Sequence, residues 1–445
     1  MFFIYSLLFT LGIIVTAPYY LWRLRGSISS SADWKQRLGI LPPQFQQTEQ
    51  SAIWVHAVSV GETLAIVGLV RESQRRYPGR KVFLSHVTIA GREASAARLP
   101  DVAGRFLLPL DWPLAVGGAM RRIRPAVLVI TETELWPNLL RAARQAGTRV
   151  LIVNGRISDR SFRRYRWIRP FMRRVLENVD GICAQSRTDA ERFCGLGMPP
   201  EKVVVSGNLK FEASPPRLGE FTRSLGSALR EGRRSPVVIA ASTMADEEES
   251  LLDAWDQVRS QYPKALLILA PRHPARFEEV ASLLKLRDLK TVRRTTLGQD
   301  AGQSTHPMSS ADVLLLDSIG ELASVFELAD LVFMGGSLVP TGGHNVLEPA
   351  YWSKAILFGP HMHNFRDITQ LLLERRAAVQ ISDQSELAGA MLELLADEAR
   401  RDELGAAALR LIEDHRGATE RVMKVLEGWL AAPALAVNAS ERGAE

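Results

Sequence analysis

The feature that most constrains the fold is a repeated alternation of short apolar runs with helix-like segments. In the first half of the chain the apolar runs are AIWVHAV, KVFLSHVT, RFLLPL, AVLVITET, RVLIVNG, GICAQS and KVVVSGN. Amphipathic segments such as ETLAIVGLVRESQRRY and WPNLLRAARQAG follow most of them. Apolar strands separated by helices are typical of a parallel sheet with helices on both faces.

The alternation stops over residues 209–235, which are rich in Pro, Gly and charge, and then starts again. The second series of runs is PVVIAAS, ALLILAP, DVLLLDS, LVFMGGS and AILFGP. We therefore predict an α/β protein with two Rossmann-like domains facing a cleft, at residues 33–208 and 236–430, with residues 209–235 as the linker. A chain of 445 residues is also too long for one ordinary core. In such sheets ligands bind beyond the carboxyl ends of the strands.

The first 25 residues, MFFIYSLLFTLGIIVTAPYYLWRLR, carry no charge before Arg23. About 20 apolar residues in a helix span roughly 30 Å, the thickness of a bilayer core. Tyr19, Tyr20 and Trp22, followed by Arg23 and Arg25, are typical of a membrane interface. We expect an uncleaved membrane anchor at residues 1–25, with the rest of the chain on the cytoplasmic side. The alternative is a helix that is buried or lies in the membrane interface.

Charge indicates an anionic partner, because the net charge is +6 and the sequence pI is about 9.4. Cys183 and Cys194 make neither a disulfide framework nor a zinc motif, which is consistent with a reducing compartment. Residues 156–174 interleave arginines with aromatic side chains, a pattern that fits an anionic membrane surface or a phosphorylated lipid. Nucleic acid and an ordinary solvated helix face are the alternatives. The arginines singled out are Arg163, Arg164, Arg166, Arg169, Arg173 and Arg174.

The most specific string is MGGSLVPTGGHNVLEPA, at residues 334–350, directly after a predicted strand. Its glycines let the backbone come close to a ligand; they are Gly335, Gly336, Gly342 and Gly343. We expect the next helix to begin near His344 and Asn345, so that its N-terminal N–H groups suit a phosphate. Glu348, one turn later, is placed to bind ribose hydroxyls. A glycine-rich turn with Glu348 as a helix-start charge is the alternative.

Two more loops after predicted strands agree with a nucleotide site. Ser242 and Thr243 follow one strand, and Arg272 and His273 follow another. An arginine there can hold a phosphate through two hydrogen bonds. For each of these loops, an ordinary helix cap or turn is the alternative interpretation. No metal site is predicted, since HMH at 361–363 has no acidic cluster or further histidine near it.

Carboxylates gather after strands of the first half. Glu132 and Glu134 share one face of a strand end, where two negative charges repel unless a cation, a proton or donors satisfy them. Ser59, Gly61 and Glu62 lie at a strand-to-helix turn. We expect Glu62 to be ionised by the helix N-terminus, the state that a general base needs. A simple helix cap is the alternative for Glu62.

Five motifs, in order and spacing, resemble those of the membrane-anchored 3-deoxy-D-manno-octulosonic acid (Kdo) transferases of lipopolysaccharide assembly. The motifs are SVGE, TETELWPN, GNLKFE, PRHPARF and GGHNVLEPA, and the similarity runs from the anchor to about residue 425. The resemblance implies a two-domain GT-B glycosyltransferase that moves Kdo, with inversion, from CMP-Kdo to a phosphorylated lipid A precursor such as lipid IVA. It also implies that no metal or other cofactor is needed, that anionic lipids of the inner membrane are partners, and that nucleic acid is not.

The resemblance also assigns roles. Glu62 matches the family's proposed base, which deprotonates the acceptor hydroxyl, and Glu132 and Glu134 match an acidic motif. Glu348 and its glycines match the nucleotide-binding stretch. Asn208 and Lys210, in GNLKFE, lie at the expected domain junction, and STMADEEE departs slightly from the usual pattern around Thr243.

Two other classes of protein share some of these features. A nucleotide-sugar epimerase can have the same architecture, but it needs neither an anchor nor the arginine-aromatic run. A non-catalytic membrane-tethered nucleotide-binding protein would not need Glu62 or the Glu132–Glu134 pair.

Overall fold

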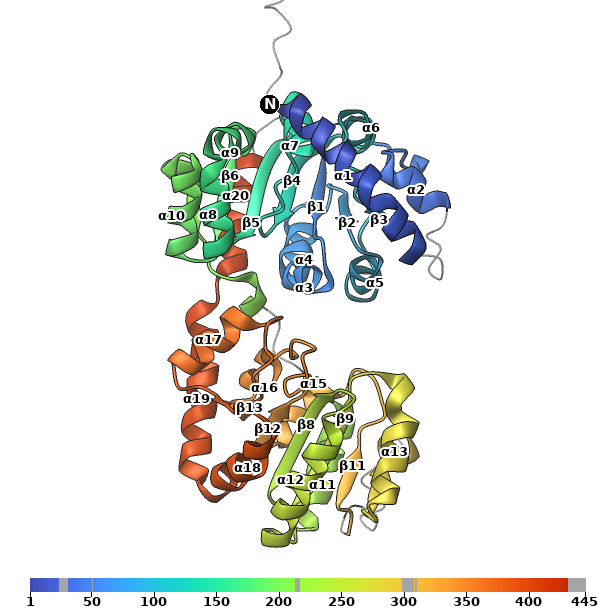
Figure 1. Ribbon diagram of the computed structural model, residues 1–445, viewed down its shortest axis with the longest axis vertical. Coiled ribbons are helices and arrows are strands. Elements are labelled where there is room, and N and C mark those ends of the chain that lie inside the picture. The colour runs from blue at the N-terminus through green and yellow to red at the C-terminus, as the bar shows by residue number, and fades with distance from the viewer. Residues whose placement is uncertain (24–30, 50, 213–216, 298–307, 309, 431–445) are drawn as a thin grey trace, which may run out of the picture. The chain divides into compact units, whose positions relative to one another are not determined.

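The computed structural model describes residues 1–23, 31–49, 51–212, 217–297, 308 and 310–430 (Figure 1). Of residues 17–23 only the backbone is described, so the expected interfacial side chains from Tyr19 to Arg25 lie outside the described residues. The chain forms two compact units. Unit 1 is Met1–Ala213 with His415–Glu445, and unit 2 is Ser214–Asp414.

Unit 1 is built on a parallel sheet of seven strands in the order β3-β2-β1-β4-β5-β6-β7. Successive residues of β1 face opposite sides, as the period of a strand requires. Trp54 packs into one core with Phe83 and Phe106, whereas Ile53 and Val55 belong to the core on the other face. The strands are β1 (Ala52–His56), β2 (Val82–His86), β3 (Gly104–Leu107), β4 (Pro125–Thr131), β5 (Arg149–Gly155), β6 (Gly181–Ala184) and β7 (Val203–Val205).

Helices cover both faces of this sheet (Figure 1). They are α1 (Phe2–Arg23), α2 (Ser31–Arg37), α3 (Val60–Ala65), α4 (Val67–Arg76), α5 (Ile89–Arg98), α6 (Pro113–Ile123), α7 (Pro137–Gln145), α8 (Asp159–Trp167), α9 (Arg169–Leu176), α10 (Arg187–Leu196) and α20 (Ala418–Leu430), with the 3-10 turn η3 (Leu209–Glu212).

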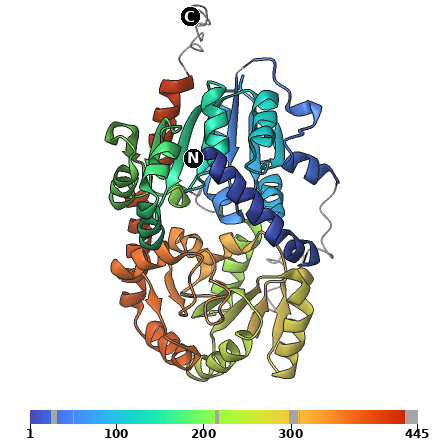
Figure 2. The ribbon, with the colours of Figure 1, turned by 45° about the horizontal axis from the view of Figure 1, so that its top comes forward.

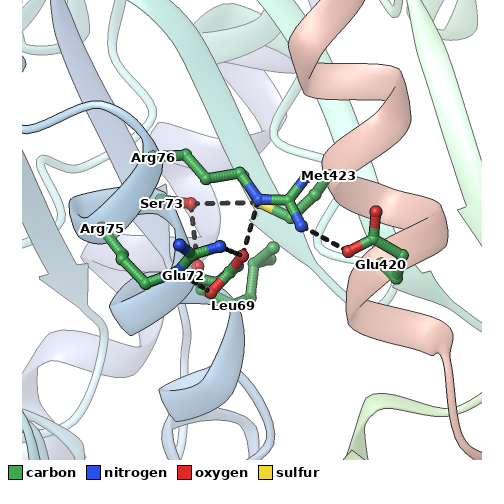
Figure 3. A network of polar contacts seen from close by, with 7 residues as sticks. All are labelled: Leu69, Glu72, Ser73, Arg75, Arg76, Glu420 and Met423. Atoms are coloured by element: carbon green, nitrogen blue, oxygen red, sulfur yellow. Dashed lines mark hydrogen bonds and ion pairs between the residues drawn. The ribbon is translucent and has the colours of Figure 1, made fainter.

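The last helix, α20, returns to unit 1 and packs on α4. Val422 and Leu426 are buried in the same core as Ile53. Figure 3 shows the polar contacts at this seam: Arg76 binds Glu72 of its own helix at 2.6 Å and also pairs with Glu420 of α20. Because the arginine is partly exposed, these ion pairs add little, and the buried apolar area is what stabilises the seam.

Unit 2 repeats the architecture with the strand order β10-β11-β9-β8-β12-β13-β14, again all parallel. Its strands are β8 (Val237–Thr243), β9 (Leu266–Pro271), β10 (Thr291–Arg293), β11 (Val313–Leu315), β12 (Leu331–Met334), β13 (Ala355–Phe358) and β14 (Val379–Gln380). Its helices are α11 (Glu220–Glu231), α12 (Glu248–Gln261), α13 (Phe277–Leu286), α15 (Leu322–Val325), α16 (Leu347–Tyr351), α17 (Arg366–Glu374), α18 (Leu387–Ala396) and α19 (Glu398–His415).

The two parallel-sheet domains expected from the sequence are confirmed, and each apolar run quoted above holds a strand. The expected boundaries are wrong in two places. Residues 209–235 are no simple linker, because η3 packs in unit 1 while α11 belongs to unit 2. Residues 236–430 are no single domain either, since the apolar face of α20 completes the core of unit 1.

The expected membrane-spanning anchor is not supported. Among the described residues, no helix is both long and apolar enough to cross a bilayer. The backbone of α1 instead runs along the outside of unit 1 (Figures 1 and 2). Ser6 Oγ accepts a hydrogen bond from the Asn138 side chain at 2.9 Å, and Thr10 Oγ1 accepts one from the Trp112 indole N–H at 3.0 Å.

Candidate functional site

Each sheet has one point where the direction of chain progression reverses. In unit 1 the chain starts at β1, adds β2 and β3 on one side, and then returns to place β4 on the other. In unit 2 the same reversal lies between β8 and β12. Ligands of open α/β sheets bind beyond the carboxyl ends of the strands at this switch point. The loops after β1 and β4 and those after β8 and β12 therefore frame the two candidate sites.

Glu62 lies directly after β1, in the first turn of α3. Ser59 is the N-cap of α3, and its Oγ lies 3.4 Å from the Glu62 N–H. The carboxylate bends back, so that Oε2 accepts from the Val58 N–H at 2.8 Å and Oε1 from Ser59 Oγ at 3.0 Å. Ser59 and Glu62 occupy the two positions of an S-x-x-E capping box, but the Glu62 carboxylate accepts from the N–H of Val58, one residue before the N-cap, and not from the Ser59 N–H. Glu62 is thus a helix-capping residue held in one orientation at the switch point.

The protonation of Glu62 differs from the expectation of a fully ionised carboxylate. Burial, with smaller contributions from the charges of Glu132 and Glu134, raises the pKa of Glu62 to about 7, against the hydrogen bonds from Val58 and Ser59 that favour the charged form. The helix start alone does not decide the charge, because desolvation outweighs it. A carboxylate with a pKa near 7 is well matched to accept a proton at neutral pH.

Glu132 and Glu134 follow β4, on the other side of the switch point. Glu132 adopts a left-handed backbone with φ of 59°, and its N–H donates to the Val153 carbonyl at 2.8 Å. Burial raises the pKa of Glu134, and the charge of Glu132 adds to the rise. A cation offsets part of this repulsion, as Lys210 Nζ lies 3.5 Å from Glu132 Oε1.

Asn208 prepares the position of Lys210, because its Oδ1 accepts from the Lys210 backbone N–H at 2.9 Å. The two residues expected at a domain junction therefore lie in unit 1, beside the acidic residues. The structure thus brings together Glu62, Glu132, Glu134 and Lys210, from three motifs far apart in sequence. Gly61 shows no steric need for glycine, since an added Cβ would meet nothing closer than Ser59 Oγ at 3.9 Å.

In unit 2 the glycine-rich loop lies beyond β12, at the switch point. Gly336, Gly342 and Gly343 have φ of 68°, 103° and 71°, a region that side chains disfavour. The Gly343 N–H donates to the Gly336 carbonyl at 2.8 Å and closes the loop. Gly335 is required for a different reason, because an added Cβ would lie 2.7 Å from both Glu247 Oε1 and the Ser242 carbonyl oxygen.

The helix after this loop begins later than expected. α16 starts at Leu347 instead of near His344, and it ends at Tyr351. The N-cap residue is Val346, and no side chain caps the helix. Asn345, one residue earlier, braces the turn, with Oδ1 accepting from the Leu347 N–H at 3.2 Å and Nδ2 donating to Glu348 Oε1 at 3.1 Å. So short a helix has little dipole, and the N-terminal phosphate site expected at His344 and Asn345 has no helix to form it.

Other candidate residues gather around the same switch point. The Arg272 N–H donates to the Thr243 carbonyl at 2.9 Å, which links the loops after β8 and β9. Burial lowers the pKa of His344 to about 4, and the nearby Arg272 and His273 lower it as well. Ser242 has φ of 55°, whereas Thr243 is buried, with Oγ1 donating to Glu248 Oε1 at 3.0 Å. Arg272 and His273 are exposed and so are open to a ligand. The Thr243 hydroxyl is buried and makes a structural contact with Glu248 instead.

Sequence reasoning missed three side chains here. Glu247 is fully buried under the glycine loop, and Glu248 is buried against Arg276 at 2.6 Å. The acidic run DEEE was a visible signal, but its pattern suggests only a helix start. Their partners, Gly336 and Arg276, are 89 and 28 residues away in sequence.

The six arginines of residues 156–174 lie on α8 and α9 and are exposed. An open groove on α9 is lined by Arg169, Arg173 and Arg174 with Pro170 and Glu177. Helix α8 also approaches the acidic residues: burial raises the pKa of Tyr165, and the charge of Glu134 adds to it. Within the described residues, no group of three or more His, Cys, Asp or Glu side chains could hold a metal ion.

These features define a class: an enzyme of two parallel-sheet α/β domains in the GT-B manner, with acidic residues at one switch point and a glycine loop at the other. A solved putative UDP-N-acetylglucosamine 2-epimerase from Listeria monocytogenes has a similar fold, with a TM-score of 0.52 and 11% identity, covering 85% of this chain and 96% of that one. At that identity the similarity concerns the fold alone.

Residues 32–213 match the family model described as 3-deoxy-D-manno-octulosonic-acid transferase (kdotransferase). The 3-deoxy-D-manno-octulosonic acid transferase of Haemophilus influenzae is 34% identical over 87% of this chain and 88% of its own length. The one of Bordetella pertussis is 33% identical over 95% of this chain and 99% of its own. The chain belongs to the 3-deoxy-D-manno-octulosonic acid transferase family. This membership favours a transferase over the two alternatives considered from the sequence, an epimerase and a non-catalytic nucleotide-binding protein.

Proposed function

We propose that this protein transfers Kdo from CMP-Kdo, with inversion, to a hydroxyl of a phosphorylated lipid A precursor such as lipid IVA. The observation that carries the proposal is the geometry of Glu62. Its carboxylate is fixed by Val58 and Ser59 at the switch point of unit 1, with a pKa of about 7. Membership of the Kdo transferase family supports the sugar and the reaction class.

In the proposed reaction, Glu62 removes the proton of the acceptor hydroxyl as its oxygen attacks the anomeric carbon of Kdo. The new carbon–oxygen bond forms on one face of the sugar while the bond to CMP breaks on the other. Proton removal by a positioned base contributes about 10²–10⁴-fold, and correct alignment of the two reactants contributes more. Glu132 and Glu134 assist by keeping the proton affinity of Glu62 high.

The donor is proposed to bind at the switch point of unit 2. The exposed Arg272 is the cation for its phosphate, the exposed His273 is a further hydrogen-bonding side chain beside it, and Ser242 and His344 border the same loops. Glu348, near Asn345 at the end of the glycine loop, is proposed to accept hydrogen bonds from ribose. CMP is already a stable leaving group, so the proposal needs no metal and no other cofactor.

The acceptor is proposed to come from the inner membrane, with α1 lying in the cytoplasmic interface instead of spanning it. One side of α1 contacts Asn138, Trp112 and Phe171 of unit 1. The other side exposes a row of large apolar side chains: Phe3, Ile4, Leu7, Leu8, Leu11, Ile14 and Val15. An apolar helix face of this kind suits the boundary between headgroups and acyl chains. Trp167 is 89% exposed beside the arginines of α8 and α9, which suit anionic headgroups and acceptor phosphates.

Product analysis by mass spectrometry tests the proposal. The purified protein is mixed with CTP, Kdo, a CMP-Kdo synthetase and lipid IVA, and Glu62→Gln is run beside it. We expect one or more Kdo masses added by the wild type and at least a hundredfold less product from the variant. Glu191→Gln, an exposed change on α10, is the matched control and keeps full activity. No product from correctly folded wild type would reject Kdo transfer to this acceptor, and an active Glu62→Gln would reject the base.

A further inference from the structure

Glu247 is a fully buried carboxylate that the proposed mechanism does not use. It is the N-cap residue of α12, at the end of the loop that follows β8. Its Oε1 accepts hydrogen bonds from the Met244 N–H at 2.8 Å and from the Gly336 N–H at 2.6 Å. Burying a carboxylate is costly unless such donors compensate it, so these bonds are central to the local structure.

The two donors belong to different loops. Met244 lies in the loop after β8, and Gly336 lies in the glycine loop after β12. Because β8 and β12 are the neighbours that flank the switch point, a single oxygen joins the two loops that frame the candidate donor site. A second bond supports this junction, as the Gly335 N–H donates to the Ala241 carbonyl at 2.8 Å.

The junction is tightly packed and conformationally restricted. Ser242 and Asp246, on either side of Met244, have φ of 55° and 69°. Gly335 touches the carboxylate so closely that an added Cβ would lie 2.7 Å from Oε1. On the far side of the turn, a Cβ on Gly336 would lie 2.9 Å from His344 Nε2. The contact chain thus runs from Glu247 through Gly336 to His344, one of the residues that border the donor site.

Glu247 cannot itself bind the donor phosphate, since two negative groups repel. Burial raises the pKa of Glu247 to about 7, and Glu248 raises it too, whereas the N–H groups of Gly336, Met244 and Leu338 favour the charged form. Through Oε1 the Glu247 side chain occupies two backbone donors and fixes the loops that carry them. We propose that Glu247 is a positioning residue that holds the glycine loop against the loop after β8, so that CMP-Kdo meets a preformed surface.

The inference rests on the donor site proposed for unit 2, and binding of CMP to the full-length protein tests both. We expect Glu247→Ala to weaken CMP binding about tenfold to a hundredfold in calorimetry, because two charge-assisted hydrogen bonds are lost. Glu247→Gln keeps one acceptor oxygen and should lose less CMP affinity than Glu247→Ala. The conservative variant should therefore rescue part of the binding. Glu249→Ala removes an exposed carboxylate from the same helix, and we expect it to bind CMP like the wild type.

A steady-state measurement separates positioning from a purely structural role. We expect Glu247→Ala to raise KM for CMP-Kdo at least tenfold while KM for the lipid acceptor stays within twofold. A fall in maximal rate with an unchanged donor KM would overturn the inference, as would wild-type CMP affinity in Glu247→Ala.

If Glu247→Ala does not fold, Glu247→Asp decides, because its shorter side chain keeps the charge but cannot reach both loops. Wild-type CMP affinity in that variant overturns the inference, and a loss of tenfold or more supports it. Failure of the proposed donor site would look different, since the wild type itself would then not bind CMP.

Discussion

At the scale of single residues, capping a helix and serving as a base are compatible roles. Glu62 makes contacts close to those of a capping box, since its carboxylate accepts from the Ser59 hydroxyl and from the Val58 N–H. What sets it apart is its surroundings, since burial and two neighbouring carboxylates keep its pKa near 7. An exposed capping glutamate would be ionised far below that pH.

The charge of Glu132 should therefore control the pH dependence of the reaction. We expect kcat/KM of the wild type to rise with pH through about 7, as Glu62 loses its proton. Glu132→Gln removes a negative charge that raises the pKa of Glu62, so the midpoint of the rise should move to lower pH. The measurement is a pH profile from 5.5 to 8.5, with Glu191→Gln as the control. A midpoint that stays in place would mean that Glu62 is not the titrating base.

Sequence pattern placed the site residues after strands, but it could not foresee their partners. The strand ends after β1 and β4 were predictable, because apolar runs mark the strands, whereas their place at a switch point is known only from the order of strands in the folded sheet. The Lys210–Glu132 pair joins residues 78 positions apart, and only the folded sheet brings them together. The raised pKa of Glu62 escaped prediction for the same reason, as burial is a property of the fold.

At the scale of elements, the long apolar strands and amphipathic helices were predictable, whereas the two edge strands of unit 2 were not. β10 and β14 have three and two residues, too few to show a period. The start of the five-residue α16 was expected too early, because His344 and Asn345 look like part of the helix in sequence, whereas the N-cap is Val346. The docking of α1 was also not predicted, since Ser6 and Thr10 are minor interruptions in an apolar segment.

The polar contacts of α1 should fix this helix on unit 1. We expect the double variant Ser6→Ala with Thr10→Ala to weaken the docking by about 1–3 kcal/mol, from two hydrogen bonds of the usual strength. Hydrogen exchange of α1 in detergent should then be faster by about tenfold or more. Thr16→Ala is the matched control, because Thr16 is exposed and its hydroxyl bonds only within α1. Equal exchange in the double variant and the control would show that the polar contacts do not hold the helix.

At the scale of the whole molecule, one buried glutamate in each unit makes stability depend on pH. The pKa values of Glu62 and Glu247 are about 7, above the 4.5 of a free glutamate. The folded state therefore binds protons more tightly than the unfolded state between these values. The contribution of these two groups to the free energy of unfolding is greatest below about pH 4.5, and it is lost as the pH rises to about 7.

Glutamine variants should reveal this contribution unit by unit. Glu62→Gln and Glu247→Gln mimic the protonated side chain, so each variant should gain stability relative to wild type as the pH rises from 5 to 8. The gain is on the order of 2–3 kcal/mol at most. Thermal unfolding followed by calorimetry at both pH values measures it, and the change should appear in the transition of the mutated unit only. A difference between variant and wild type that is the same at pH 5 and pH 8 would contradict the raised pKa.

The return of α20 has a consequence for the order of events during synthesis on the ribosome. Unit 2 is an insertion within unit 1, and two residues of unit 1 that flank the insertion are adjacent, as the Phe211 and His415 rings stack with their centroids 4.7 Å apart. The apolar face of the first sheet that α4 also covers lacks α20 until about 200 more residues have been translated. At roughly 5–20 residues per second that delay is on the order of 10–40 s. During that interval the nascent chain offers chaperones a partly uncovered apolar face, and a chain truncated before residue 418 would be prone to aggregate even though every candidate site residue is present.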